Sequence, residues 1–227
     1  MRVHWLQHAE HEELGCIAPW LAARKFKVTR TRLHAGEELP ASSDFDWLIV
    51  MGGPMNIYEH DRYPWLINEK ALISDACVTD KKVLGICLGA QLLADILGGR
   101  VTRSLNAEIG WFDVSLTDEG EKSELFTVFR SPMPVFHWHG DTFAIPPGSR
   151  NLLKSDACVN QAFMAGPKRL GLQFHLEITH ADAARWLETD APDPDRYVQS
   201  REEMLRDPAR FEANNRAMLG VLDLFVA

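Results

Sequence analysis

Residues 83–99 read VLGICLGAQLLADILGG and change character at Cys87. The run before this cysteine is short and apolar, which predicts a buried strand, and residues 88–97 have helical spacing and end at two glycines. A strand that bends sharply into a helix places the residue between them at the carboxyl edge of a parallel sheet, where ligands bind. The stretch therefore predicts an α/β fold with Cys87 at its binding edge.

Further segments repeat this alternation of strand and helix along the first half of the chain. Strands are expected at residues 3–6, 26–31 and 47–51, and helices at residues 16–25 and 65–78. The segment 47–51, WLIVM, is apolar throughout, which is typical of a strand buried on both faces. The alternation predicts a mostly parallel central sheet with helices on both faces.

The second half of the chain has a different pattern, in which short strand-like runs are separated by turn residues. We expect these runs to extend the sheet as a meander, at residues 111–116, 133–139, 143 and its neighbours, 151–154, 162–165 and 170–174. Helices are expected again at residues 181–187, 197–205 and 208–226, around a loop rich in proline and aspartate at 190–195. We expect one domain over residues 1–227, with its motifs at about 47–180 and a helical C-terminal extension at about 181–227.

Composition narrows the class of protein. The net charge is −8, from 24 basic and 32 acidic residues, and no basic patch argues for a nucleic-acid partner. The four cysteines form no CxxC pair, so neither a zinc site nor a disulfide framework is expected. No apolar run approaches the ~20 residues of a membrane span, and the N-terminal segment lacks a signal-peptide core, so we expect no membrane partner and a cytoplasmic location.

The residues around Cys87 suit a nucleophile. Gly85-Ile86-Cys87-Leu88-Gly89 is the cysteine counterpart of the G-x-S-x-G elbow, in which two glycines make a tight turn sterically possible. The N-terminus of the following helix stabilises a negative charge on the sulfur. The alternative is a buried structural cysteine in an ordinary strand-to-helix turn.

A nucleophile of this kind needs a base and a group that orients the base. In Gln173-Phe174-His175-Leu176-Glu177, which follows an apolar run, His175 and Glu177 are two residues apart and point to the same side of an extended chain. A histidine at the end of a strand is by itself more often structural than catalytic. Its combination with an elbow cysteine and a nearby carboxylate favours a Cys-His-Glu triad.

Acyl transfer also needs donors for the developing oxyanion. Gly52-Gly53-Pro54 follows the apolar run 47–51, and glycine lets backbone approach a substrate closely. The backbone N–H groups of Gly53 and Leu88 are therefore the expected oxyanion-hole donors. The alternative for Gly-Gly-Pro is a plain turn.

These motifs together resemble the class I (triad) glutamine amidotransferase family. The matching segments are MGGP at 51–54, GICLGAQLLA at 85–94, HGD at 139–141 and QFHLE at 173–177. The resemblance implies a flavodoxin-like three-layer α/β domain that hydrolyses the side-chain amide of glutamine through a γ-glutamyl thioester on Cys87. It implies no cofactor.

The resemblance also assigns roles by position. Cys87 matches the nucleophile, His175 the general base and acid, and Glu177 the orienting carboxylate. The expected substrate-binding residues are Gln91, which lies four residues after the cysteine, and the loop Trp138, His139, Gly140 and Asp141, whose backbone contacts the α-amino and carboxylate end of the substrate. Asp95 is expected to be structural.

The substrate and the partner stay open. A related superfamily with a cysteine elbow has a histidine directly after the nucleophile, and Leu88 at that position argues against it. After QFHLE the chain has no room for a synthase that consumes ammonia, so it looks most like free-standing, GMP-synthase-like members. The alternatives are a γ-glutamyl peptidase that acts on γ-glutamyl conjugates, and a subunit that is inactive without an ammonia-accepting synthase partner.

Several further residues have weaker signals. His137 and His139 share one face of an extended stretch, but no third ligand is apparent, so no metal site is expected. His4, His8 and His11 lie close together in the N-terminal segment, and no metal site is expected there either. Residues 60–63 are expected to be a solvated loop, with the pocket mouth as the alternative. The large apolar residues of the C-terminal extension, among them Trp186, are expected to pack in the core, with covering the site or forming a dimer contact as the alternatives.

Overall fold

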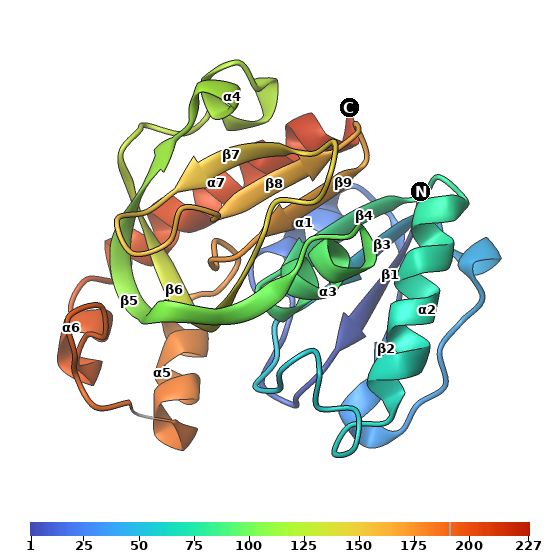
Figure 1. Ribbon diagram of the computed structural model, residues 1–227, viewed down its shortest axis with the longest axis horizontal. Helices are drawn as coiled ribbons and strands as arrows, with labels where there is room; N and C mark the ends of the chain where they lie inside the picture. Colours follow the sequence, from blue (N-terminus) through green and yellow to red (C-terminus); the bar gives the residue numbers. More distant parts are fainter. Residues whose placement is uncertain (191) are drawn as a thin grey trace.

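The structure, a computed structural model, describes residues 1–190 and 192–227. These residues form one nine-stranded sheet with helices packed against it (Figure 1). Ala191, within the loop expected at 190–195, lies outside the described residues. The strands are β1 (Arg2–Gln7), β2 (Lys27–Arg32), β3 (Trp47–Val50), β4 (Lys82–Ile86), β5 (Val101–Leu116), β6 (Met133–Phe143), β7 (Arg150–Lys154), β8 (Ala162–Ala165) and β9 (Arg169–Leu172).

The helices are α1 (Ile17–Ala23), α2 (Trp65–Val78), α3 (Leu88–Ile96), α4 (Asp118–Glu121), α5 (His180–Thr189), α6 (Arg201–Leu205) and α7 (Pro208–Val226). Short 3₁₀ helices lie at Leu33–Ala35, Ser42–Asp44 and Glu124–Phe126. No helix among the described residues is both long enough and apolar enough to cross a membrane.

The sheet has the strand order β2-β1-β3-β4-β9-β8-β7-β5-β6. The five strands from β2 to β9 pair in parallel, and the remaining pairs, from β9 to β6, are antiparallel. The first half thus confirms the parallel α/β core, and the second half confirms the expected meander. Because β1, β3, β4 and β9 are neighbours and parallel, the segments that follow them meet at one edge of the sheet.

Alternating side chains of the central strands pack into two separate cores. Trp47 and Ile49 of β3 belong to the cluster that includes α1 and α7, whereas Leu48 and Val50 belong to the cluster with α2 and α3. All four are fully buried. This pattern explains the continuous apolar run and gives the expected flavodoxin-like three-layer arrangement, with a helical layer on each face of the sheet (Figure 1).

Three elements differ in extent from the sequence prediction. The strands β5 and β6 form a long antiparallel ribbon with an irregularity between Arg103 and Glu108, where only short runs were expected. Much of the first part of β5 is exposed and polar, so it lacks the apolar alternation by which a strand is recognised. In the C-terminal part, residues 197–200 precede α6 rather than belong to it, because Ser200 caps the helix and accepts a hydrogen bond from the Glu203 N–H.

The bend at Cys87 has the sharp geometry that its sequence predicts. Cys87 has φ +50° and ψ −105°, a backbone conformation that side chains rarely adopt and that costs about 1–3 kcal/mol. A Cβ on Gly85 would lie 2.4 Å from the Gly89 oxygen, and one on Gly89 would lie 2.0 Å from the Val50 oxygen. Both glycines are therefore needed for the turn and for the contact of α3 with β3.

Candidate active site

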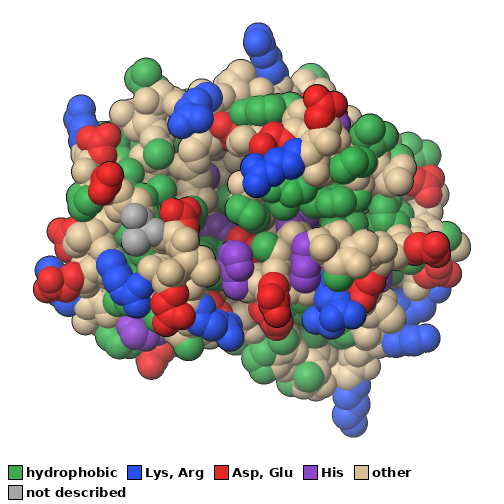
Figure 2. All heavy atoms as spheres, turned by 90° about the horizontal axis from the view of Figure 1, so that it is seen from below, with side chains coloured by type: hydrophobic (Ala, Val, Ile, Leu, Met, Phe, Trp, Pro, Cys, Tyr) green, Lys and Arg blue, Asp and Glu red, His purple; other side chains and the backbone are tan. Residues whose placement is uncertain are grey.

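A cavity of about 530 Å³ lies at the carboxyl edge of the parallel strands. Among the residues expected to form the site, it is lined by Cys87, His175, Gly53, Leu88, Gln91, Trp138, His139, Gly140 and Asp141. Figure 2 shows the molecule from below, and histidine side chains gather beside a hollow near the centre of that face. The fold thus brings together residues from four segments that are far apart in sequence.

His175 and Glu177 form a buried pair behind this cavity. His175 Nδ1 donates a hydrogen bond to Glu177 Oε1 at 2.7 Å, and both side chains are buried. Burial alone would lower the pKa of His175, but the Glu177 carboxylate and the Cys87 sulfur outweigh it and raise the pKa well above its usual value. The pair therefore fixes the ring and leaves Nε2 free to exchange a proton.

Cys87 is held at the cavity wall between β4 and α3. Its thiol lies 3.5 Å from the Trp138 carbonyl oxygen, and only 6% of the residue is exposed. The other cysteines differ: burial raises the pKa of Cys16 to about 12 and also raises the pKa of Cys77 and of Cys158. Neither Cys16, Cys77 nor Cys158 lines the cavity.

The backbone beside Cys87 offers two unused donors. The N–H groups of Gly53 and Leu88 have no backbone or side-chain acceptor within the described part of the chain, and both residues line the cavity. The Gly52 carbonyl, which shares a peptide unit with the Gly53 N–H, accepts a hydrogen bond of 2.8 Å from His8 Nδ1. The Gly52–Gly53 peptide is therefore fixed from behind.

The expected substrate-binding residues lie along one wall of the cavity. Gln91 Nε2 donates to the Gln173 side-chain oxygen at 3.2 Å and to the Asp141 carbonyl at 3.4 Å. The His139 side chain is fully buried while the residue as a whole is 4% exposed, so its exposed atoms are backbone. Tyr58 donates its hydroxyl to Asp141 at 3.1 Å. Residues 138–141 lie within strand β6 rather than in the expected loop, and among them His139 presents only backbone to the cavity.

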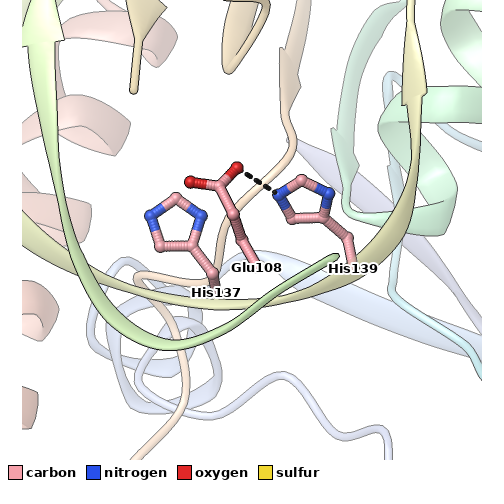
Figure 3. A group of neighbouring side chains, drawn as sticks. All are labelled: Glu108, His137 and His139. Atoms are coloured by element: carbon pink, nitrogen blue, oxygen red, sulfur yellow. Dashed lines mark ion pairs between the residues drawn. The ribbon is translucent and has the colours of Figure 1, made fainter. Parts of the chain in front are cut away.

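Glu108 lies beside His137 and His139 and forms a cluster with them (Figure 3). The sequence did not reveal this third member. Glu108 and His139 lie 3.2 Å apart, and Glu108 also accepts hydrogen bonds from Ser155 at 2.6 Å and Gln161 at 2.7 Å. Burial lowers the pKa of His137 to about 3. An imidazole pair and a carboxylate are a donor set that zinc accepts, but here each carboxylate oxygen already has a protein donor. This favours a hydrogen-bonded cluster that joins β5 and β6.

The segment that follows β1 lies at the site, which was not expected from its sequence. Within it, Glu12 and His11 line the cavity, and His8 contacts Glu69 of α2 at 2.7 Å. The backbone N–H of Cys16 donates to the Glu177 oxygen at 2.8 Å. The signal that could have revealed this segment is its position, because polar residues directly after a central parallel strand lie at the binding edge.

The geometry also bears on three weaker expectations. Trp186 of α5 packs edge-on against the His175 ring with centroids 5.0 Å apart and lines the cavity, so the C-terminal extension covers the site as well as packing in the core. Residues 60–63 do not line the cavity. Asp95 pairs with Lys70 at 2.8 Å away from the cavity, in keeping with a structural role.

Comparison with known proteins points to one family. The family model described as "Glutamine amidotransferase class-I" matches residues 16–191. The glutamine amidotransferase-like protein YfeJ of Salmonella typhimurium is 36% identical over 183 residues, which are 79% of this chain and 77% of that protein. A subunit of the glutamine-hydrolysing GMP synthase of Saccharolobus solfataricus is 34% identical over 142 residues, 61% of this chain and 70% of that protein.

A solved structure agrees with these sequence matches over nearly the whole chain. The crystal structure of a glutamine amidotransferase from Methylobacillus flagellatus has a TM-score of 0.91 and 32% identity, and the match covers 99% of this chain and 94% of that one. The family match spans more than half of the residues, and the structural match includes the sheet and the elbow. The chain belongs to the class I glutamine amidotransferase family.

Proposed function

We propose that the protein hydrolyses the side-chain amide of glutamine, or of a γ-glutamyl compound, through a thioester on Cys87. The observation that carries the proposal is the elbow geometry of Cys87 in one cavity with His175, whose ring is held by Glu177. The bend at φ +50° places Cys87 in the cavity wall at the sheet edge, next to the two backbone N–H groups for which the described residues offer no acceptor. This is the arrangement that acyl transfer requires.

In the first step, the Cys87 thiol gives its proton to His175 Nε2, and the thiolate Sγ attacks the amide carbon and forms the C–S bond. The negative charge that develops on the carbonyl oxygen is stabilised by the backbone N–H groups of Gly53 and Leu88. His175 gives the proton on Nε2 to the amide nitrogen, the C–N bond breaks, and ammonia or an amine leaves. Glu177 keeps the ring oriented and stabilises its charged form.

In the second step, water attacks the thioester carbon. Neutral His175 takes a proton from this water, and the C–S bond breaks. Glutamate is released, and the starting form of the enzyme is regenerated. Gln91 and the backbone of residues 138–141 hold the α-amino and carboxylate end of the substrate during both steps. Every group in this cycle belongs to the chain, the substrate or water.

The test compares glutamine with γ-glutamyl dipeptides and follows ammonia, free amine and glutamate. We expect release of one nitrogen product per glutamate in the wild type, a loss of ~10⁴-fold or more in Cys87→Ala, and no loss in Cys77→Ser. Added hydroxylamine should divert the thioester to γ-glutamyl hydroxamate. Equal turnover by wild type and Cys87→Ala would disprove the assignment.

A second candidate is a subunit that requires a synthase, and the likeness to the Saccharolobus GMP synthase subunit favours it. This alternative predicts little turnover by the isolated protein, although Cys87 would still be alkylated by a glutamine-like diazoketone. Stimulation of glutamine hydrolysis by a co-purified partner would support it. Full turnover of γ-glutamyl dipeptides by the isolated protein would instead identify a γ-glutamyl peptidase.

A further inference from the structure

Glu12 is a buried acidic residue with an unused oxygen at the active site. Only 7% of the residue is exposed, yet it lines the same cavity as Cys87 and His175. Its Oε2 has no hydrogen-bond partner among the described residues. A buried carboxyl oxygen without a donor is costly, which indicates that a donor from outside the chain completes the site.

The side chains of Glu12 and His175 both lie close to the backbone of Gly52. A Cβ built on Gly52 would lie 3.1 Å from Glu12 Oε2 and 3.1 Å from His175 Cε1. The two side chains therefore approach the same side of the Gly52 backbone, and the two atoms are at most twice that distance apart. Cε1 joins Nδ1 and Nε2, so Oε2 lies near the edge of the imidazole that carries both ring nitrogens, one of which is the Nε2 that serves the leaving group.

The segment that carries Glu12 is fixed to the triad. A Cβ on Gly15 would lie 2.1 Å from the Glu177 carbonyl oxygen, which the Cys16 N–H also contacts at 2.8 Å. This close approach, with Gly15 at φ +49°, leaves little freedom for the loop. Glu12 is thus held in place before a substrate arrives, which lowers the cost of using it.

Both ring nitrogens of His8 and the Nδ1 of His175 are already engaged and do not donate to Glu12. His8 contacts the Gly52 carbonyl at 2.8 Å and Glu69 at 2.7 Å, and His175 Nδ1 contacts Glu177. The proposed reaction brings one new N–H donor to this place, the nitrogen that leaves the acyl group. An amide nitrogen that gains a proton from His175 also gains positive character, which strengthens a hydrogen bond to a carboxylate.

We propose that Glu12 forms the leaving-group subsite and accepts a hydrogen bond from the N–H of the departing ammonia or primary amine. This inference rests on the proposed hydrolysis at Cys87. It adds a substrate class, because the subsite recognises γ-glutamyl amides, whose leaving atom carries hydrogen, over γ-glutamyl esters, whose leaving oxygen does not. The bonds made and broken are those of the first step, and Glu12 itself exchanges no covalent bond.

The neighbours of Glu12 shift the pKa of its carboxyl group. Burial raises the pKa of Glu12 to about 7, with Glu177 acting in the same direction, while His175 and His8 act against it. The carboxylate form, which is the better acceptor, therefore grows as the pH rises through neutrality. The acid limb of amide cleavage should follow this ionisation.

The test measures the first turnover of two substrates with the same γ-glutamyl group, one an anilide and one an aryl ester. In Glu12→Gln we expect the rate of amine release from the anilide to fall by ~10- to 100-fold, the contribution of one hydrogen bond to a charged group. The rate of phenol release from the ester should stay within about two-fold, since this step uses the same nucleophile and oxyanion donors but no N–H. The exposed neighbour variant Glu13→Gln serves as the control and should change neither rate.

Equal losses on both substrates would overturn the inference, because they would show that Glu12 acts only through folding or through the triad. An unchanged anilide rate would overturn it as well. Retained ester cleavage reports that the variant is folded, and Glu12→Asp, which withdraws the oxygen but keeps the charge, should lose anilide cleavage alone. If the wild type cleaved neither substrate, the proposed hydrolysis would fail instead.

Discussion

His8 donates a hydrogen bond from Nδ1 to the Gly52 carbonyl oxygen at 2.8 Å, while its Nε2 faces Glu69 Oε1 at 2.7 Å. Carbonyl and carboxylate oxygens can only accept, so the ring carries hydrogen on both nitrogens. Burial opposes this charged form, but Glu69 and the Gly52 carbonyl outweigh it and raise the pKa of His8. A buried imidazolium thus stands directly behind the Gly52–Gly53 peptide.

The hydrogen bond from His8 also affects the N–H group of the same peptide unit. In a trans peptide the C=O and the N–H point in opposite directions, so fixing the Gly52 oxygen also fixes the direction of the Gly53 N–H. A donor on the carbonyl also polarises the N–H of the same unit. His8 and Glu69 are therefore positioning residues for the proposed oxyanion hole.

The first prediction concerns the rate. His8→Ala should lower kcat for glutamine or γ-glutamyl amides by about 10-fold, below the ~10²–10³-fold cost of removing an oxyanion donor outright, since the Gly53 N–H remains. KM should change little. Alkylation of Cys87 by iodoacetamide should keep its rate, because displacement at an alkyl carbon forms no oxyanion.

The matched control is His4→Ala. His4 is also buried, but its ring contacts Thr29 and Thr31 on β2 and does not line the cavity. A similar fall in kcat in both variants, or a parallel fall in the alkylation rate, would show that His8 acts through general stability.

The second prediction concerns pH and folding. Because the pKa of His8 is raised in the folded protein, its stabilising contribution is fully present below the unfolded value of 6.5 and is lost as the pH rises through the folded value. The loss of unfolding free energy caused by His8→Ala should therefore be largest near pH 6 and smaller at pH 9. Urea unfolding of wild type and variant at both pH values measures this, and a loss that grows with pH would contradict the charged pair.

The sequence was sufficient for features that depend on neighbours along the chain. The Cys87 bend follows from a buried strand, two glycines and an amphipathic helix within residues 83–99, and the His175–Glu177 pair follows from a spacing of two. The order of strands was not needed for either inference. Only their meeting at one sheet edge required the parallel topology, which the alternation of strands and helices supplied.

The features that the sequence did not reveal depend on contacts between distant segments. His8 and Glu69 are separated by 61 positions, and their contact requires that the segment after β1 reach α2. The Glu108 cluster joins β5 and β6 across a ribbon whose irregular register could not be read from the polar residues around it. Glu12 belongs to no sequence motif, and its proposed role follows from the residues that surround it in the fold.

The third prediction concerns the elbow. Gly89→Ala should reduce the free energy of unfolding by about 3 kcal/mol or more, because its Cβ would lie 2.0 Å from the backbone oxygen of Val50, which cannot move without shifting β3. Gly140→Ala is the comparison, as a Cβ there meets nothing within 4 Å. Its stability should change by less than about 1 kcal/mol. Similar losses in the two variants would contradict the packing argument.

The fourth prediction concerns the cluster of Glu108, His137 and His139. A transition-metal ion there would have to displace the Ser155 and Gln161 donors from the carboxylate, and His137 is packed between the rings of Phe112 and Phe174, with centroids 6.1 and 6.0 Å away. We therefore expect less than about 0.1 metal ion per chain in protein purified without chelator, and the same melting temperature with EDTA. Stoichiometric zinc, retained by the wild type and lost in His137→Phe, would show instead that the cluster is a metal site.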